Sequence, residues 1–281
     1  MKCQTALIAT VGNKLLKTYC MKNENIKYGI CIWCRKEKPE VTFYNKPHTI
    51  SKQIGAINIG FDICDSCNSY FGTSNKYQMS IELAFKEIFN VTRFLIPDSE
   101  KGDNGLKRMK SVYFEYYKSQ RVLRIKRRFE LQRSFLQNFT RQFKRGVYEV
   151  FLQEFHRNTG RALEEKFDDI RKFVRYDRGD LPLYFADNNG IYLLPVKRES
   201  PSFEFDNNVI STIDDFGFYL LWLFGHIFYL EVTPKAYLSR EIFLKNEAKR
   251  IGAPGFIIKG IREMKYITEL DFALLKLYGM K

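Results

Sequence analysis

The clearest pattern of hydrophobic and polar positions lies in the middle of the chain, at residues 131–157. Phenylalanine stands at positions 135, 139, 143, 151 and 155 and valine at position 147, among polar and charged neighbours. An apolar stripe with this four-residue spacing is typical of a helix that lays one face on a core. The pattern predicts a long helix that Gly160 ends, and a shorter helix at 163–176.

Patterns typical of strands stand on both sides of this helix. Alternating residues at 111–117 and 121–129 predict a β-hairpin before it. Strand-like segments that follow it are 181–186, 190–196 and 202–206. An apolar run at 216–232 contains two glycines, a histidine and a glutamate. We interpret this run as a buried hairpin rather than a membrane span.

The first third of the chain predicts smaller elements. β-branched and aromatic residues at 41–45 predict one strand, and a second begins at His48. A helix is expected to open at Asn68 and to resume at 81–89 after a break. The loop 97–105 is rich in Pro, Gly, Asp and Ser and is the expected linker between two parts, residues 1–96 and 106–281. The fold class is therefore predicted to be α+β.

Composition agrees with a folded protein. The 281 residues are 45% hydrophobic and 16% aromatic, which is ample for a core. The N-terminus has no long apolar region followed by a small-residue cleavage site. We therefore expect a cytoplasmic protein without a membrane segment.

Four cysteines are paired in a way that indicates metal binding. Cys31 and Cys34 form one Cys-x-x-Cys unit, Cys64 and Cys67 form another, and 29 residues separate the two units. Each unit presents two sulfurs to one ion, so four thiolates can close a tetrahedral structural Zn²⁺ site. The 29-residue interval leaves room for a hairpin between the units.

The order of these residues resembles the HNH, or ββα-metal, endonuclease family, in particular its zinc-stapled members. The resemblance consists of Cys-x-x-Cys, a strand-borne His48, and a Cys-x-x-Cys unit followed at once by Asn68. It implies an N-terminal zinc-bound ββα-metal module, followed by a helical and β-rich region. It also implies that His48 is the general base and that Asn68 binds a catalytic Mg²⁺ or Mn²⁺.

The sequence departs from the family immediately before the histidine. A metal ligand is common there in the family, whereas this chain has Pro47, which can bind nothing. Nearby carboxylates that could supply the second ligand are Asp62, Asp65 and Glu82. We expect Asp65, because the second cysteine unit holds it close to Asn68.

Charge points to a polyanionic partner. The net charge is +14, and residues 101–145 hold fourteen basic residues against three acidic ones. Such a field attracts phosphates, so nucleic acid, and double-stranded DNA in particular, is the expected partner. The residues expected to contact it are Arg124, Lys126, Arg127 and Arg128.

The resulting hypothesis is a metal-dependent HNH endonuclease that hydrolyses phosphodiester bonds in DNA. Proteins that resemble it in this way often act in phage defence or in mobile elements, and a homodimer or a partner protein is compatible with the hypothesis. Pro47 favours the alternative, a catalytically silent zinc module that binds DNA or RNA as an adaptor in a larger complex. A ribonuclease or toxin built on the same module is a third interpretation.

Overall fold

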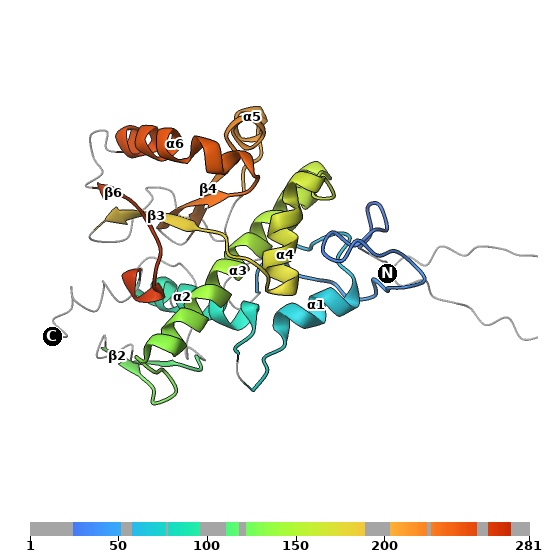
Figure 1. Ribbon diagram of the computed structural model, residues 1–281. Helices are drawn as coiled ribbons and strands as arrows, with labels where there is room; N and C mark the ends of the chain where they lie inside the picture. Colours follow the sequence, from blue (N-terminus) through green and yellow to red (C-terminus); the bar gives the residue numbers. More distant parts are fainter. Residues whose placement is uncertain are drawn as a thin grey trace, which may run out of the picture.

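A single long helix, α3 (Arg133–Thr159), crosses the middle of the protein (Figure 1). The structure, a computed structural model, describes residues 25–51, 58–76, 78–95, 111–117, 122–188, 203–223, 226–251 and 258–270. The predicted amphipathic helix is confirmed, because the stripe residues from Phe139 to Phe155 are buried. The helix ends at Gly160, whose φ of 76° lies in the left-handed region that glycine adopts without strain.

An antiparallel sheet packs on one side of α3, in the strand order β4-β5-β3-β6. The strands are β3 (Leu183–Asn188), β4 (Phe218–Leu223), β5 (His226–Glu231) and β6 (Ile258–Glu263). Side chains alternate between its two faces. Leu183 and Phe185 join the core around α3, whereas Tyr184 and Ala186 join a second cluster on the opposite face.

Helix α6 (Lys235–Ile251) covers that opposite face and supplies Ala236 and Ile251 to the second cluster (Figure 1). Helix α5 (Asn207–Phe216) precedes β4, and its buried Ile213 belongs to the core around α3. The predicted hairpin at 216–232 is confirmed, since β4 and β5 pair with Leu223 opposite His226. The strand predicted at 202–206 is wrong for its described part, because the Asp206 side chain caps α5 by accepting from the Val209 N–H at 2.8 Å. The strand predicted at 190–196 lies outside the described residues.

The predicted basic hairpin is confirmed. Strands β1 (Phe114–Tyr117) and β2 (Val122–Ile125) pair antiparallel, with Glu115 opposite Arg124. Lys126 follows β2, and its N–H donates to the carbonyl of Tyr113 at 2.8 Å, which extends the pairing by one residue. The hairpin lies near the N-terminal end of α3 (Figure 1).

Two helices precede the hairpin, α1 (Asp65–Gly72) and α2 (Ile81–Leu95). Helix α1 begins three residues before the predicted start, because Cys64 caps it by accepting from the Cys67 N–H. Helix α2 packs along α3 where Gly146 lets the two backbones approach: a Cβ at this position would lie 3.0 Å from the Cβ of Phe85.

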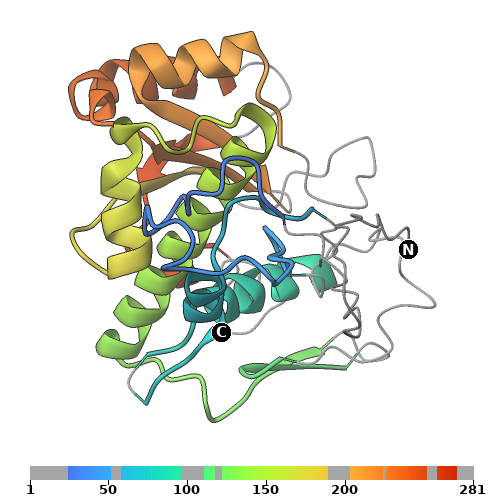
Figure 2. The same cartoon turned by 90° about the vertical axis from the view of Figure 1, so that its right-hand side faces the viewer.

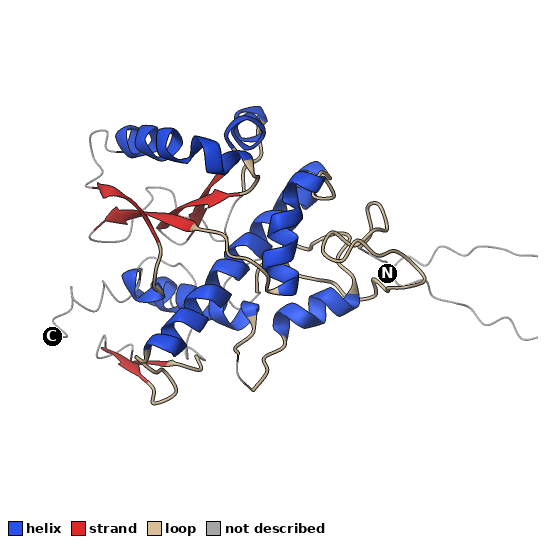
Figure 3. Cartoon of the chain, in the orientation of Figure 1, coloured by secondary structure: helices blue, strands red, loops and turns tan. Residues whose placement is uncertain are grey.

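The described parts of segment 25–60 contain no strands, and the two-stranded ββα hairpin is not seen. Residues 25–51 are loop throughout (Figure 3). Pairing in the described parts is reduced to two isolated bridges, Ile30 with Glu37 and His48 with Ile59. The second bridge is flanked by Thr49 N–H to Asn58 O at 3.2 Å and Gly60 N–H to Pro47 O at 2.8 Å.

The strand predicted at 41–45 does not form because a side chain occupies its donors. The N–H groups of Tyr44 and Asn45 donate to the Asp65 carboxylate, at 3.0 and 2.8 Å, instead of to a neighbouring strand. The hydroxyl of Thr42 also donates to this carboxylate, at 2.5 Å. The segment is therefore held as a loop against the start of α1.

The two parts predicted from sequence share a core. One buried cluster contains Trp33 and Phe71 from the first part together with Phe143 and Phe151 from the second. The loop segment 25–51 lies across the side of α3 and α4 (Asp168–Tyr176) in both orientations (Figures 1 and 2). The expected linker at 97–105 lies outside the described residues.

A carboxylate at the end of α4 joins three of these elements. Asp177 accepts from Gln78 at 3.0 Å, before α2, and from Arg141 Nε at 2.7 Å, on α3. Its other neighbour is Arg145, at 3.4 Å. Burial alone would raise the pKa of Asp177, but these donors and charges outweigh it and lower the pKa. Two short 3₁₀ turns complete the described fold, η3 (Glu165–Phe167) and η4 (Ile267–Glu269).

Candidate functional site

The four predicted ligand cysteines come together. The sulfurs of Cys31, Cys34, Cys64 and Cys67 all lie within 4.8 Å of one another, and the Sγ atoms of Cys34 and Cys64 are 3.8 Å apart. A tetrahedral zinc with Zn–S bonds of about 2.3 Å requires sulfurs separated by about 3.8 Å. The cluster therefore has the size and the donor set of a structural zinc site.

Backbone groups position the thiols as in a metal-binding turn. In the first unit the Arg35 N–H donates to the Cys31 carbonyl at 2.9 Å, with Arg35 itself in the left-handed region. In the second, the Cys67 N–H donates to the Cys64 sulfur at 3.4 Å, and the Cys64 N–H donates to the Cys31 sulfur at 3.5 Å. Donors aimed at sulfur stabilise the thiolates that bind metal.

The charge of the cluster is balanced from α4. Arg175 donates through Nε to the Cys67 sulfur at 3.2 Å, and its guanidinium lies over the Tyr70 ring at 4.3 Å. Within the cluster, the hydrogen bond with Cys31 lowers the pKa of the Cys64 thiol. Cysteine thiols bind metal as thiolates, so a cation that binds the cluster displaces the thiol protons.

Asp62 has a structural role beside the cluster. Its carboxylate is fully buried and accepts from the N–H groups of Lys27, Tyr28 and Gly29. It also pairs with the ring of His156 on α3, with 2.9 Å between Oδ2 and Nε2. Burial alone would raise the pKa of Asp62, but these hydrogen bonds outweigh it and lower the pKa. Its oxygens are used to fasten the loop before Cys31 to α3.

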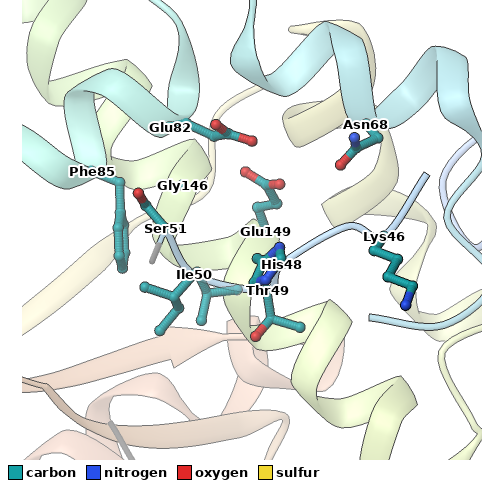
Figure 4. Close-up of a pocket in the computed structure, with 11 residues that line it drawn as sticks. Lys46, His48, Thr49, Ile50, Ser51, Asn68, Glu82, Phe85, Gly146 and Glu149 are labelled. Carbon is teal, nitrogen blue, oxygen red and sulfur yellow. The ribbon is translucent and has the colours of Figure 1, made fainter. Parts of the chain in front are cut away.

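A pocket of about 240 Å³ lies next to the four-cysteine cluster, between the loop 46–51 and the three helices α1, α2 and α3. Figure 4 shows the side chains that surround it. The residues that line the pocket are Lys46, His48, Thr49, Ile50, Ser51, Asn68, Glu82, Phe85, Gly146, Glu149 and Val150. The pocket thus brings together the two predicted catalytic residues, His48 from the loop and Asn68 from α1.

Two glutamates face this pocket from different helices. Glu149 on α3 is buried and accepts from Gln153 Nε2 at 2.8 Å. Burial, reinforced by the charge of Glu82, raises the pKa of Glu149 well above its ordinary value. Glu82 on α2 is exposed at the rim, close to Gly72, and desolvation by the surrounding protein raises its pKa.

The segment that carries His48 is braced by α3. Glu154, which is fully buried, accepts from the Thr49 hydroxyl and from Asn58 Nδ2, the latter at 3.0 Å. These two donors come from the residues next to the paired positions His48 and Ile59. A carboxylate on the long helix therefore fixes the position of the histidine in the pocket wall.

The remaining predicted site residues lie elsewhere. Asp65, the expected second metal ligand, does not line the pocket, and both of its oxygens accept hydrogen bonds from residues 42–45. Arg127 and Arg128 are exposed, and Arg124 lies over the Tyr117 ring at 4.9 Å. The Lys126 ammonium donates to the Ser111 carbonyl at 2.7 Å, so it supports the hairpin.

Sequence inspection missed Glu149, although a pattern indicated it. Helix α3 carries a second stripe, of buried polar residues, beside the phenylalanine stripe: Gln142, Arg145, Glu149, Gln153 and His156. Polar groups buried at helical spacing need partners, so they mark a face that contacts another polar element. On this face Arg145 contacts Tyr70 of α1, Glu149 shares the pocket with Glu82 of α2, and His156 contacts Asp62, just before Cys64.

Comparison with known proteins returned nothing: no protein-family model, no curated protein and no solved structure matches this chain. Among the described helices, none combines the length and the apolar character that crossing a membrane requires.

Proposed function

We propose that this protein is a metal-dependent endonuclease of the HNH type that hydrolyses phosphodiester bonds in DNA. The observation that carries the proposal is the common pocket of His48 and Asn68 beside a four-cysteine cluster. The two residues are 20 positions apart in sequence, yet they line one cavity whose other polar groups are carboxylates, hydroxyls and a lysine.

His48 is the proposed general base. An imidazole changes its proton occupancy close to neutral pH, and this side chain is half-buried at the pocket wall. It takes a proton from a water molecule, and the water oxygen then forms a bond to phosphorus. The bond between phosphorus and one sugar oxygen breaks, and the departing oxygen takes up a proton from solvent.

The pocket residues fit a divalent cation of the Mg²⁺ class, because an amide oxygen and carboxylates are the ligands that this ion prefers. Asn68 is the residue proposed to hold it. When bound, Mg²⁺ or Mn²⁺ stabilises the negative charge that develops on the phosphate and on the leaving oxygen.

Lys46 and the basic hairpin are proposed to hold the nucleic acid. Lys46 is exposed at the pocket. Arg124, Arg127 and Arg128 are also exposed, on β2 and the turn after it. Together with the net charge of +14, these groups favour binding to a phosphate backbone.

Pro47 favours a second function, a zinc module that binds DNA or RNA without cleaving it. Proline offers no metal ligand at the position where the family commonly has one. In this case the cluster and the basic hairpin keep their roles, and the pocket has no catalytic task.

A nicking assay separates the two functions. Supercoiled plasmid is incubated with zinc-loaded protein in Mg²⁺, in Mn²⁺, and in chelator too weak to remove zinc, and a structured RNA is tested in parallel. Divalent-dependent conversion of plasmid to the open circle supports the DNA endonuclease. Binding to either nucleic acid without cleavage under both metals supports the silent module, and cleavage of RNA alone supports a ribonuclease.

A further inference from the structure

Two carboxylates from different helices meet in the pocket, and neither forms an ion pair with a described residue. Glu149 is only 6% exposed, and its single donor among the described residues, Gln153, binds Oε1. No described residue donates to Oε2, and the carboxylate points into the pocket (Figure 4). Glu82 forms no ion pair within the described part of the chain; the nearest favourable charge is that of Lys86.

This arrangement is costly unless something positive enters it. A buried carboxylate loses hydration, and a second carboxylate nearby adds like-charge repulsion. The charges of Arg145 and Lys86 oppose the rise in the pKa values of Glu149 and Glu82 only in part, and among the described residues neither of these two basic groups forms an ion pair with the glutamates. Arg145 instead donates to the carbonyl of Val174, at 2.6 Å, and to the hydroxyl of Tyr70.

We propose that Glu82, Glu149 and Asn68 form a binding site for one divalent cation of the Mg²⁺ and Mn²⁺ class. Three oxygen donors from α2, α3 and α1 converge on one cavity, and two carboxylates match the charge of the ion (Figure 4). The carboxylates provide the ligand that Pro47 cannot. This inference deepens the proposed function and rests on it for the role of the cation.

The geometry also explains why Asp65 is not needed. Its oxygens hold the loop 42–45 against α1, so binding a cation would cost those hydrogen bonds. Within the described ranges, the only hydrogen bond to the carboxylates of Glu82 and Glu149 is the one from Gln153. The alternative is that Glu149 is a protonated acid with a purely structural role. In that case replacing Glu149 with glutamine would leave the affinity for Mn²⁺ unchanged.

Direct metal titration tests the site without nucleic acid. Free Mn²⁺ is followed by its electron paramagnetic resonance signal while zinc-loaded full-length protein is titrated near neutral pH. The variants are Glu149→Gln, Glu82→Gln and Asn68→Ala, with Glu241→Gln on the exposed face of α6 as the matched control. Thermal denaturation with and without Mn²⁺ is recorded for each.

The wild type and Glu241→Gln are expected to bind one Mn²⁺ and to gain thermal stability from it. Removing an outer hydrogen-bond partner of a metal ligand already weakens metal affinity by about 10–100-fold, so each glutamine variant should be weakened at least as much. Without Mn²⁺, Glu149→Gln is expected to be as stable as wild type or more so, because the like-charge repulsion is removed.

Equal Mn²⁺ affinity in wild type and both glutamine variants would overturn the site, as would a wild type that binds no Mn²⁺. Glu82 is exposed, so its variant folds even if Glu149→Gln does not. The two proposals fail separately. If metal-dependent cleavage persists in both glutamine variants, the cation site is refuted and the nuclease proposal stands. If Mn²⁺ binding depends on the two glutamates but the protein does not cleave, the nuclease proposal is refuted and the cation site stands.

Discussion

Removing the Glu154 carboxylate should release the His48 segment from α3. Glu154 is fully buried and accepts from Thr49 and Asn58 at the same oxygen, Oε1. A hydrogen bond to a charged group contributes about 1.5–3 kcal/mol. Glu154→Ala removes two such bonds and leaves both donors without their acceptor, so it should lower the free energy of unfolding by about 3–5 kcal/mol.

The matched control is Glu154→Gln. Glutamine retains an oxygen that can accept both bonds; it gives up the charge and the 3.6 Å ion pair with Arg157, and it puts an amide N–H at the buried position of Oε2. The cost should therefore be about 1–2 kcal/mol, below that of the alanine variant. Urea denaturation of the zinc-loaded protein measures both values, and the Thr49→Val single and double variants supply the coupling between the two residues.

Two results would refute this reasoning. Equal destabilisation by the alanine and glutamine variants would mean that the accepting oxygen does not hold the loop. Additive effects of Thr49→Val and Glu154→Ala would mean that these two side chains do not interact in solution. A coupling of about 1.5–3 kcal/mol is the expected outcome.

Three further predictions follow from the described contacts. Elemental analysis should find one zinc per chain, and Cys64→Ser should unfold the loop around the cluster, because such sites contribute on the order of 10 kcal/mol to folding; full stability without zinc contradicts this. Replacing Arg124, Arg127 and Arg128 with Ala should reduce the slope of log affinity for DNA against log salt concentration by about 0.9 for each phosphate that is no longer neutralised. An unchanged slope would mean that these arginines are exposed to solvent and do not contact phosphates. The lowered pKa of Asp177 stabilises the fold above the carboxyl's unfolded pKa, and this contribution disappears as pH falls through the lower folded pKa. Asp177→Asn should therefore destabilise the protein at neutral pH but not in acid, and an equal drop in unfolding free energy at both pH values would argue against it.

Local patterns predicted the parts of the fold that local physics determines. The phenylalanine stripe of α3 and the apolar run of β4 and β5 each satisfy their own periodicity, and both elements formed where expected. The two Cys-x-x-Cys units likewise carry their chemistry within four residues. Each of these features is formed by residues that are close in sequence, so a local sequence pattern is enough to predict it.

Long-range contacts decided the rest. Residues 41–45 have strand-forming side chains, but the N–H groups of Tyr44 and Asn45 donate to the Asp65 carboxylate instead of to a neighbouring strand. No local sequence pattern predicts this long-range hydrogen bonding. Helix α6 was missed because apolar residues such as Leu238 and Ile242 lie on its exposed face and blur the amphipathic pattern. Glu149 lies 101 positions after His48, and only the packing of α3 brings it to the pocket.

The central claim is that His48 acts as the base in a metal-dependent cleavage pocket. The most direct measurement is the initial rate at which supercoiled plasmid is nicked in Mg²⁺ by wild type and by His48→Ala, both loaded with zinc and matched in thermal stability. A positioned base contributes roughly a hundredfold or more, so the variant should be slower by at least that factor. Equal rates, or no cleavage by wild type under any divalent metal, would contradict the claim.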